Sequence, residues 1–523
     1  MRDIVYWCKL ATTEKEFDDI AALNYETFVE EIPQYKPNEK RRKVDRFHKE
    51  NQYIVVYKET EIIGMIAFRD KRPFSLDEKI GSIEQYLQDS DCERLAEIRL
   101  LAVKKAYRTG RVFFRLIQAV YAFAYHQGYS AAVISGTTRE QKLYKQMGFE
   151  PFAGAVGSEE AKFVPMILTR KKFEQELEKR ISKGNDYTFY PGPVKQNVSL
   201  THTNVSHRSA EFRDLFQRMK QQLQRLSGAS HIAAAVGSGT LANDIMLGQL
   251  KISSSKKGLI LVNGEFGNRL VDQAMSWGIP FDTVNADWGV PFDLVTIEQH
   301  LETGDFEWVL MVHGETSTGT LNPIEPILEL TKRFNVKLCA DCISSFGAIP
   351  FSMKELYLAT SVSGKALGAM SGLAFIFSQQ LAQEAQIPSY LSLAKYQKST
   401  PPFTVPTMLA ANVLEALKDY PDRYRLLEQR FMQLQNLKIV ENYGISTNHY
   451  PMIVTLQIPN ELMALNEDLK INGLLLHAES AYLRERNFIQ LSTIQPDFEE
   501  ALKQLEEIVG HYLTVIEEPR VYS

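Results

Sequence analysis

Short apolar runs alternate with amphipathic helical stretches through the second half of this 523-residue chain. Apolar residues between Phe212 and Leu226 recur at the spacing of one helix face. His231–Val236 and Leu259–Val262 have the length and composition of buried strands, and a helical pattern follows each of them. Such alternation predicts a mainly parallel sheet with helices on both faces, in which ligands bind at the carboxyl ends of the strands.

Composition is typical of a soluble globular protein. The chain has 44% hydrophobic and 24% charged residues, and its length suggests about three domains. A net charge of -5 offers no basic surface for nucleic acid, and no apolar run is long enough for a membrane span. The N-terminal residues include no apolar segment of signal-peptide length, so we expect a cytoplasmic protein.

Cys339 and Cys342 form a CxxC pair, but no second pair accompanies them. They fall at the end of the apolar run Val336–Ala340, where a strand directs the two side chains to opposite faces. The total of four cysteines fits a reducing compartment. We therefore expect no metal site at this pair.

A charged helical stretch followed by a polar break divides the chain. The stretch covers Arg170–Arg180, and the break covers Ser182–Asp186. We predict four parts: residues 1–172, a linker over residues 173–187, a large domain over residues 188–388 and a small C-terminal domain over residues 389–523.

One lysine lies in a turn of small residues between two apolar runs. The first run ends at Ser361, the turn Ser363–Gly364 precedes Lys365, and Gly372–Phe377 is typical of the next strand. A lysine held between buried strands can have a lowered pKa. An amine with a lowered pKa can form a Schiff base with an aldehyde, which makes Lys365 a candidate catalytic residue.

Further polar segments occur upstream, each at the end of a predicted strand. Gly237–Thr240 opens a helix whose free N–H groups can hold an anion. Phe266 can lie flat on an aromatic ring, and His313–Gly319 concentrates hydroxyl groups and a carboxylate. Asp341 can pair with a protonated pyridine nitrogen. Taken singly, each segment is also compatible with an ordinary turn or a core position.

The order of these segments closely resembles the class V aminotransferases, which are fold type I enzymes that use pyridoxal phosphate. The resemblance covers most of residues 187–420, from Tyr190–Pro193 to Thr400–Pro402. It is greatest for the 2-aminoethylphosphonate–pyruvate and alanine–glyoxylate transaminases. It implies a large domain with a mainly parallel sheet and helices on both faces, a smaller α+β C-terminal domain, and a homodimer.

The resemblance also implies roles for individual residues. Lys365 would hold the cofactor and move the proton, and Asp341 would pair with the pyridine nitrogen. The other cofactor contacts would come from Ser238, Gly239, Thr240, Phe266, Thr316, Ser363 and, across the dimer interface, Thr400. The turn that contains Pro191 and Gly192 would border the substrate pocket.

The chain departs from this family near its C-terminus. Members that bind an α-carboxylate carry an arginine there, and Gln490 takes its place within Phe488–Ile494. A glutamine cannot make the charged two-point contact of an arginine with a carboxylate. Arg484 or Arg486 can substitute for it. Otherwise the substrate lacks an α-carboxylate, or the enzyme is a lyase or a condensing enzyme of the same fold. Gln490 remains a candidate substrate-binding residue.

The first half of the chain has a different order of elements. A predicted helix over Glu16–Val29 precedes a hairpin, the strand Glu97–Val103 and the helix Val112–Gln127. Together with the segment Tyr144–Pro151, this order resembles the GNAT superfamily of N-acyltransferases, and within it the long-chain acyl amino acid and autoinducer synthases.

That resemblance implies an α+β acyltransferase domain with Glu97 as the general base and Tyr144 as the general acid. A strand-end carboxylate and a half-buried core tyrosine are the alternative readings of these two residues. In the family's pyrophosphate loop, Arg111 and Phe113 replace two small residues, and such bulk blocks the approach of a phosphate to the backbone. The acyl donor is then an acyl carrier protein in place of acyl-CoA, or the domain binds an acyl group without catalysis and regulates the transaminase.

Together these patterns predict a bifunctional α/β enzyme. The C-terminal part would move an amino group between a small amine or amino acid, such as 2-aminoethylphosphonate, alanine or serine, and an oxo-acid. The N-terminal part would acylate an amine, with acyl-CoA or acyl carrier protein as the donor.

Overall fold

The computed structural model describes most of the chain in two compact units. The described residues are 6–32, 35–87, 93–108, 110–138, 140–157, 162–181, 186–196, 205–399, 401–445 and 448–517. The first unit combines Met1–Thr188 with Asn460–Leu475 and Glu499–Ser523, and the second combines Phe189–Pro459 with Leu476–Phe498. These units group segments by packing, and the four-part division of the sequence stays a prediction.

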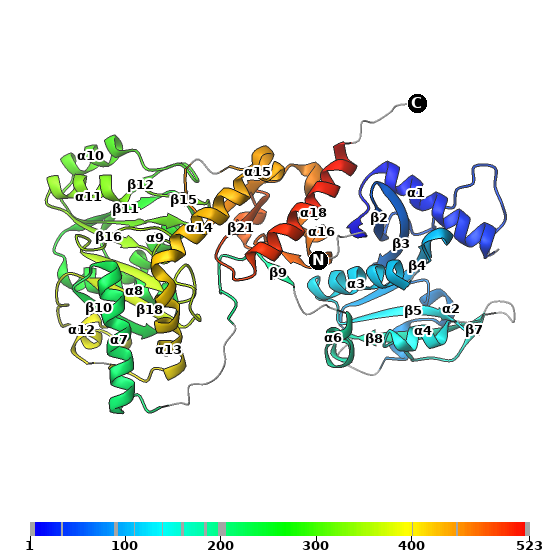
Figure 1. Ribbon diagram of the computed structural model, residues 1–523, viewed down its shortest axis with the longest axis horizontal. Coiled ribbons are helices and arrows are strands. Elements are labelled where there is room, and N and C mark those ends of the chain that lie inside the picture. The colour runs from blue at the N-terminus through cyan, green and yellow to red at the C-terminus, as the bar shows by residue number, and fades with distance from the viewer. Residues whose placement is uncertain are drawn as a thin grey trace. The chain divides into compact units, whose positions relative to one another are not determined.

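An eight-stranded sheet forms the centre of the first unit (Figure 1). Its path is β1-β2-β3-β4-β5-β8-β6, and β7 pairs with β8. The strands are β1 (Trp7–Leu10), β2 (Gln52–Lys58), β3 (Glu61–Arg69), β4 (Leu95–Val103), β5 (Ala131–Thr137), β6 (Glu150–Pro151), β7 (Val156–Gly157) and β8 (Lys162–Thr169). The strands β4 and β5 pair in parallel, and the neighbouring pairs are antiparallel.

Alternate residues of these strands face two layers, as the period of two in a strand requires. Ile54 belongs to the apolar cluster that also contains the buried face of α3 (Gly110–His126). Tyr57 points the other way, and its hydroxyl donates a 2.8 Å hydrogen bond to Glu16 of α1 (Glu14–Tyr25). The predicted helix at this place ends earlier than expected, because the α-helix gives way to a π-helical stretch over Glu26–Glu31.

The remaining helices of the first unit come from both ends of the chain. They are α2 (Asp77–Ile80), α4 (Gln141–Gln146), α5 (Arg170–Lys172), α6 (Glu178–Ile181), α16 (Leu465–Ile471) and α18 (Phe498–Glu517). In addition, β9 (Tyr187–Thr188) pairs in parallel with β20 (Leu474–Leu475).

The edge strand β1 is covered by α16. The N–H of Leu10 donates to Asp468 Oδ1 at 2.6 Å. The N–H of Cys8 donates to Asn472 Oδ1 at 3.2 Å, and Asn472 Nδ2 donates back to the Cys8 carbonyl at 2.7 Å. Four residues of a helix rise by about 6 Å, and two residues of a strand rise by about 6.6 Å. Side chains four residues apart on the helix therefore lie opposite alternate residues of the strand. The contact satisfies backbone groups that an edge strand otherwise leaves unpaired.

A seven-stranded sheet forms the centre of the second unit, in the order β10-β18-β17-β16-β13-β11-β12. The strands are β10 (His231–Val236), β11 (Lys257–Val262), β12 (Phe281–Asn285), β13 (Phe306–Val312), β16 (Lys337–Asp341), β17 (Leu358–Val362) and β18 (Leu373–Ser378). The strands β12, β11, β13, β16 and β17 pair in parallel, and β18 is antiparallel to both of its neighbours. This arrangement confirms the expected mainly parallel sheet.

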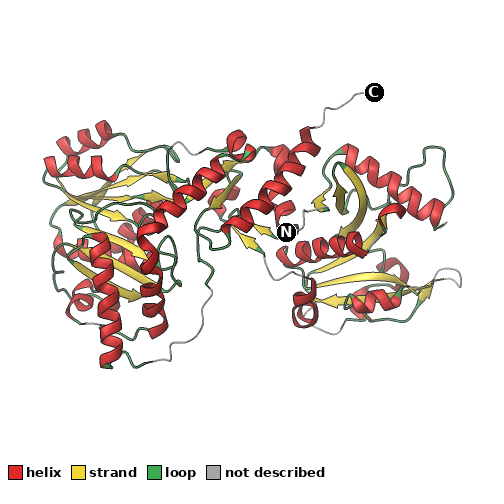
Figure 2. Cartoon of the chain, viewed as in Figure 1, coloured by secondary structure: helices red, strands yellow, loops and turns green. Residues whose placement is uncertain are grey.

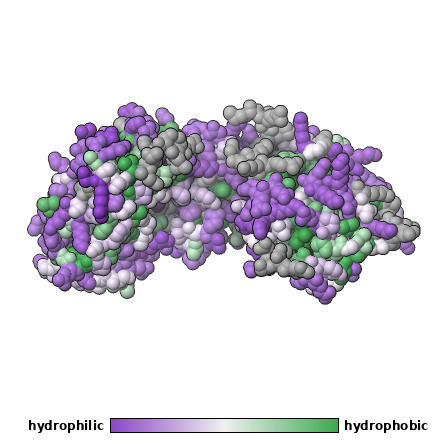
Figure 3. Space-filling model, turned by 90° about the horizontal axis from the view of Figure 1, so that it is seen from below, coloured by the Kyte–Doolittle hydropathy of each residue, from purple (hydrophilic) through white to green (hydrophobic). Residues whose placement is uncertain are grey.

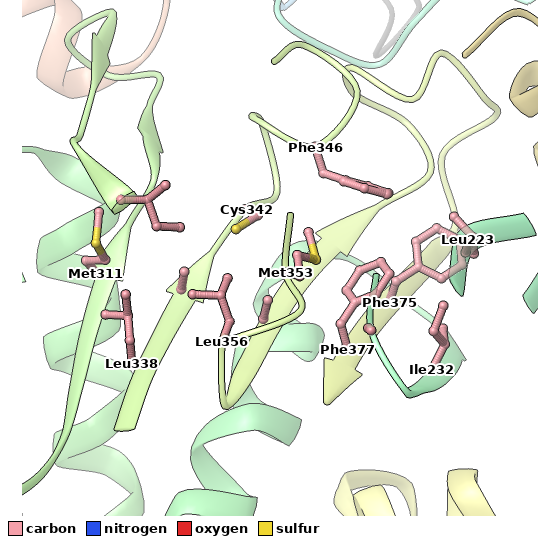
Figure 4. Close-up of a cluster of buried hydrophobic side chains, with 14 of the residues drawn as sticks. Leu223, Ile232, Met311, Leu338, Cys342, Phe346, Met353, Leu356, Phe375 and Phe377 are labelled. Carbon is pink, nitrogen blue, oxygen red and sulfur yellow. The ribbon is translucent and has the colours of Figure 1, made fainter. Parts of the chain in front are cut away.

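Helices cover both faces of this sheet (Figure 2). One face packs on α7 (Ala210–Ser227), α10 (Leu294–Thr303), α11 (Ile324–Arg333) and α13 (Thr407–Ala416). The other packs on α8 (Gly239–Ser253), α9 (Glu265–Trp277) and α12 (Leu393–Lys398). Figure 4 shows the first cluster, where Phe375 and Phe377 lie near Met353, and Leu338 lies near Met311. The neighbouring residue Cys339 belongs to the opposite cluster, because successive strand residues point to opposite faces.

Smaller elements complete the second unit. They are α14 (Tyr420–Gln435), α15 (Lys438–Tyr443), α17 (Ala481–Arg484) and the two-stranded pairs β14 (Gly314–Glu315) with β15 (Thr320–Leu321) and β19 (Ile453–Gln457) with β21 (Phe488–Ser492).

Hydrophilic residues predominate on the face shown in Figure 3, with small hydrophobic areas between them. Among the described residues, we find no helix with the length and apolar character needed to cross a bilayer.

The contact between β1 and Asn472 gives a testable prediction. Replacing Asn472 with alanine leaves the buried N–H and carbonyl of Cys8 without these partners. We expect the free energy of unfolding to fall by about 1–3 kcal/mol, measured by urea denaturation of the full chain. Asn460→Ala, at an exposed position of the same unit, should change it by less than about 0.5 kcal/mol. Equal effects of the two substitutions would contradict the role of Asn472.

Candidate active sites

A cavity of about 250 Å³ lies at the carboxyl ends of the parallel strands of the second unit. Its lining includes Val312 at the end of β13, Asp341 at the end of β16 and Val362 at the end of β17. Parallel strands bring their carboxyl ends to one edge of the sheet, so groups that are far apart in the sequence meet there. The predicted residues that line the cavity are Gly192, Ser238, Gly239, Thr240, Phe266, Thr316, Asp341 and Lys365.

Lys365 follows β17 and its turn, and it borders the cavity. Burial among protein groups lowers the pKa of its ammonium group, while the nearby carboxylates of Asp341 and Glu315 oppose that shift. Its Nζ lies 5.1 Å from the centre of the Phe266 ring. The lysine and the aromatic ring therefore face the same space, and a flat molecule on the ring is within reach of the amine.

Asp341 is 4% exposed and accepts two hydrogen bonds. Asn243 Nδ2 donates to Oδ2 at 2.7 Å, and the N–H of Ile343 donates to Oδ1 at 2.9 Å. Burial raises the pKa of this carboxyl group, and the two donors and Lys365 oppose the rise. The surroundings thus offset part of the cost of an ionised carboxylate in the cavity wall.

Asn243, which the sequence reasoning missed, has a fixed orientation. The hydroxyl of Thr360 donates to Asn243 Oδ1 at 2.7 Å, so the amide nitrogen must face Asp341. An asparagine within a helix is typically exposed, and the only hint in the sequence was its position four residues after the glycine-rich turn.

The N-terminus of α8 forms one wall of the cavity. Ser238, Gly239 and Thr240 all line it, and the first backbone N–H groups of a helix are free to hold an anion. A Cβ atom at Gly239 would come within 2.5 Å of Ile343 Cδ1, so a side chain there is not accommodated without movement.

Gly192 lies against the loop that carries Lys365. Its φ of 142° lies in the region that favours glycine, and a Cβ atom would approach Lys365 Cγ to 3.4 Å. Pro193 also lines the cavity, whereas Pro191 does not. The role of this turn in substrate binding stays a prediction.

Glu315 holds the start of α9, which carries Phe266. This buried carboxylate accepts hydrogen bonds from the N–H groups of Phe266 and Gly267, each at 3.1 Å, and from the hydroxyl of Ser317 at 2.5 Å. Burial raises its pKa, and these donors oppose the rise. Glu315 thereby positions the aromatic ring.

Gln490 is fully buried and does not line the cavity. Its Nε2 donates to the carbonyl of Thr316 at 2.7 Å and to Thr455 Oγ1 at 3.0 Å. Both amide hydrogens are thus used, so Oε1 must accept from His477 Nδ1, at 2.9 Å. The side chain supports the Thr316 loop, and its contact with substrate stays a prediction.

Ser363 and Thr400 are the two remaining predicted cofactor residues. Ser363 donates to the carbonyl of Met370 at 2.6 Å and accepts from the N–H of Leu373 at 3.1 Å, so its hydroxyl closes the lysine turn outside the cavity lining. Thr400 lies outside the described residues. The predicted cofactor roles of both residues stay predictions.

A second cavity, of about 110 Å³, lies in the first unit. The pairing of β4 with β5 stops at Glu97 and Val133, and beyond this point Leu100 adopts a positive φ of 55°. The strands separate there and leave room for the cavity. Its lining is mostly apolar: Ile66, Ile98, Leu100, Leu101, Ile117, Val120, Ile134, Met147 and Phe149, with Arg99, Tyr121, Ser135 and Tyr144.

The two predicted catalytic residues of this unit lie in different surroundings. Tyr144 borders the second cavity. Glu97 is 1% exposed and does not line it. Glu97 accepts from the N–H groups of Ser75 at 2.9 Å and of Leu76 at 3.1 Å, and from the Ser75 hydroxyl. These donors fix the segment after β3, which is a structural use of the carboxylate; its role as a base stays a prediction.

The hydrogen bond between Asn243 and Asp341 predicts a pH-dependent effect on stability. Asn243→Leu removes a donor that stabilises the ionised carboxylate more than the protonated acid, and burial already raises the pKa of Asp341. Ionisation increases as the pH rises through that raised pKa, so the variant should lose more unfolding free energy at pH 8 than at pH 5. We expect a loss of about 1–3 kcal/mol at pH 8, measured by urea denaturation of the cofactor-free protein.

Asn268→Leu, at an exposed position on α9, is the matched control and should show no such pH dependence. A loss at pH 8 in Asn243→Leu no larger than that in Asn268→Leu would contradict the assigned hydrogen bond.

Models of known families match both parts of the chain that hold a cavity. A family model described as aminotransferase class-V matches residues 194–399, and one described as N-acyl amino acid synthase FeeM matches residues 19–171. The class-V match includes Lys365 of the first cavity, and the FeeM match includes Tyr144 of the second.

Characterised relatives resemble the second half of the chain. A 2-aminoethylphosphonate–pyruvate transaminase of Pseudomonas putida (strain GB-1) is 27% identical over 318 residues, which cover 55% of this chain and 86% of that protein. Another, from Pseudomonas aeruginosa, is 32% identical over 250 residues, which cover 44% of this chain and 67% of that protein.

Solved structures of two aminotransferases share the fold. Ureidoglycine–glyoxylate aminotransferase from Bacillus subtilis has a TM-score of 0.56 and 18% identity, and the match covers 64% of this chain and 95% of that one. Alanine–glyoxylate aminotransferase from Nostoc sp. has a TM-score of 0.53 and 24% identity, with coverage of 64% and 96%. From the family matches, these relatives and the shared fold we conclude that the chain belongs to the class V aminotransferases and is homologous to the 2-aminoethylphosphonate–pyruvate transaminases, with an N-terminal FeeM-type domain.

Proposed function

We propose that the second unit transfers the amino group of a small acidic amine to an oxo-acid with pyridoxal phosphate as cofactor. The observation that carries the proposal is the convergence of Lys365, Asp341 and Phe266 on one cavity. The names of the Pseudomonas relatives make 2-aminoethylphosphonate the first donor to test and pyruvate the first acceptor. Alanine and serine are the other donors in this proposal.

The chemistry of the cavity fits this cofactor. Asp341 offers a carboxylate for the pyridine nitrogen, Phe266 offers a ring to stack on, and the N-terminus of α8 offers N–H groups for the phosphate. When bound, pyridoxal phosphate supplies an electron sink next to the carbon that carries the amino group.

Lys365 contributes the base. Its amine, with a pKa lowered by burial, would take the proton from the carbon that carries the donor's amino group and would hold it for transfer. Asp341, when ionised, would hold a protonated pyridine nitrogen. Phe266 would stack on the flat ring and restrict its movement.

We propose that the first unit acylates an amine, with the acyl chain in the second cavity. The apolar lining suits a hydrocarbon chain, and Tyr144 at its border suits a proton donor to the leaving thiolate. Acyl-CoA and acyl carrier protein both release a thiolate, so both are donors in this proposal. The altered phosphate loop around Arg111 and Phe113 supports the carrier protein.

Assembly and location complete the proposal. The family resemblance at Thr400–Pro402 supports a homodimer, which sedimentation equilibrium tests directly. Four cysteines in 523 residues support a cytoplasmic location.

Lys365→Ala tests the transaminase proposal. The variant should lose at least about 1,000-fold in kcat, because Lys365 is the one lysine among the described residues that line the cavity. Borohydride reduction of the native protein should attach the cofactor irreversibly to the peptide that contains Lys365, as seen by mass spectrometry. The surface variant Lys418→Ala should behave like the native protein. Attachment to a different lysine would refute the assignment.

Tyr144→Phe tests the acyltransferase proposal. Removing the hydroxyl should lower acyl transfer at least about 10-fold and leave transamination unchanged, measured with acyl-CoA and acyl carrier protein as alternative donors. Phenylalanine keeps the ring that packs over Gly136, so the fold should survive. Unchanged acylation would show that Tyr144 is not the acid.

A further inference from the structure

Three charged side chains line the larger cavity: Asp341, Lys365 and Arg269. The proposed function uses the first two and leaves Arg269, on α9, without a role. The Arg269 side chain is 53% exposed, so it borders both the cavity and the solvent. This is the position that an entering substrate meets first.

Arg269 and Lys365 approach the same aromatic ring. The guanidinium carbon lies 4.9 Å from the centre of the Phe266 ring, and Lys365 Nζ lies 5.1 Å from the same centre. One small molecule can therefore reach both cations. Arg269 contributes to lowering the pKa of Lys365, since two nearby positive charges repel each other. An anion bound beside them relieves this repulsion.

The guanidinium is held in a defined orientation. Its Nε donates to Glu265 Oε1 at 3.0 Å, one helical turn back on α9. Its two Nη groups donate no hydrogen bond to any residue that the structure describes. One edge of the planar group is thus fixed and the other is available for the two-point contact that arginine makes with phosphonate, sulfonate or carboxylate.

Other polar groups near the cavity are less suited to an anion. The amide hydrogens of Gln490 are used by Thr316 and Thr455. Burial lowers the pKa of His477, which favours the uncharged imidazole. Among the described residues that line the cavity, Arg269 is therefore the cation left for the acid group of a substrate.

We propose that Arg269 binds the acid group of the amine donor, so that this site selects amines that carry a phosphonate, sulfonate or carboxylate over neutral amines. The inference rests on the proposed function, because Lys365 and Asp341 must be engaged with the cofactor. The donor's acid group stays at the solvent side of the cavity, and its amine extends toward Lys365.

Steady-state kinetics with matched donors tests selectivity. The donors are 2-aminoethylphosphonate and 2-aminoethanol, in which a hydroxyl replaces the acid group. In Arg269→Gln, kcat/KM should fall about 10- to 100-fold for 2-aminoethylphosphonate and less than about 3-fold for 2-aminoethanol. Arg269→Lys keeps the charge and should fall between the native protein and Arg269→Gln. Equal losses for both donors would overturn the proposal.

A binding measurement gives a readout that does not depend on turnover. Ethylphosphonate has the acid group but no amine, so it cannot react. In isothermal titration calorimetry with the cofactor-loaded protein, its Kd should rise at least about 10-fold in Arg269→Gln. The surface variant Arg333→Gln is the control and should leave the Kd unchanged. Unchanged ethylphosphonate binding in Arg269→Gln would overturn the proposal.

The affinity for the cofactor distinguishes the two anions that suit Arg269: the acid group of the donor and the phosphate of the cofactor. The Kd for pyridoxal phosphate should change less than about 3-fold in Arg269→Gln. If that Kd rises 10-fold and donor selectivity is unchanged, Arg269 serves the cofactor phosphate and the proposal is wrong. If the native protein turns over no donor, the proposed function fails, and ethylphosphonate binding still decides whether Arg269 is an anion site.

Discussion

Two opposite charges, Asp341 and Lys365, share the wall of one cavity, and the second unit is arranged around them. Removing an ion from water costs several kcal/mol unless nearby groups stabilise it. Asp341 receives hydrogen bonds from Asn243 and from the backbone of Ile343, and Asn243 is itself held by Thr360. Lys365 instead relaxes toward the neutral amine, since burial lowers its pKa. The donors thus favour the ionised form of Asp341 and burial favours the basic, neutral form of Lys365, as amino transfer requires.

The same constraint explains the buried carboxylates that lie outside the cavities. Glu315 accepts hydrogen bonds at the start of α9, and Glu97 accepts them from the segment after β3. In both cases the donors include backbone N–H groups and one serine hydroxyl, and these contacts fix a loop while they stabilise the acid. These buried carboxylates therefore hold segments of backbone without lining either cavity. A carboxylate at such a position can have a structural role.

Much of the second unit could be predicted because its pattern is local. Helix and strand periods identify the alternation, and the parallel sheet then brings Ser238, Asp341 and Lys365 to one edge. Gly278 ends α9 with a positive φ of 61°, a conformation that glycine commonly adopts at the end of a helix. These features depend on neighbours within a few residues.

Features that depend on distant partners were not predictable. Nothing near Asn472 in the sequence indicates that it pairs with Cys8, more than 450 residues away. No neighbouring residue indicates that Gln490 forms hydrogen bonds with Thr316 and His477, because these partners lie on other elements. Similarly, Asn243 could not be linked to Asp341 before both were placed in three dimensions.

The absorption spectrum of the cofactor-loaded protein tests the central claim most directly. The account predicts that 2-aminoethylphosphonate, added without an acceptor, abolishes the visible band in one turnover, and that pyruvate restores it. A band that no small amine changes, or one that is lost with release of product and is not restored by any oxo-acid, would contradict amino transfer at Lys365.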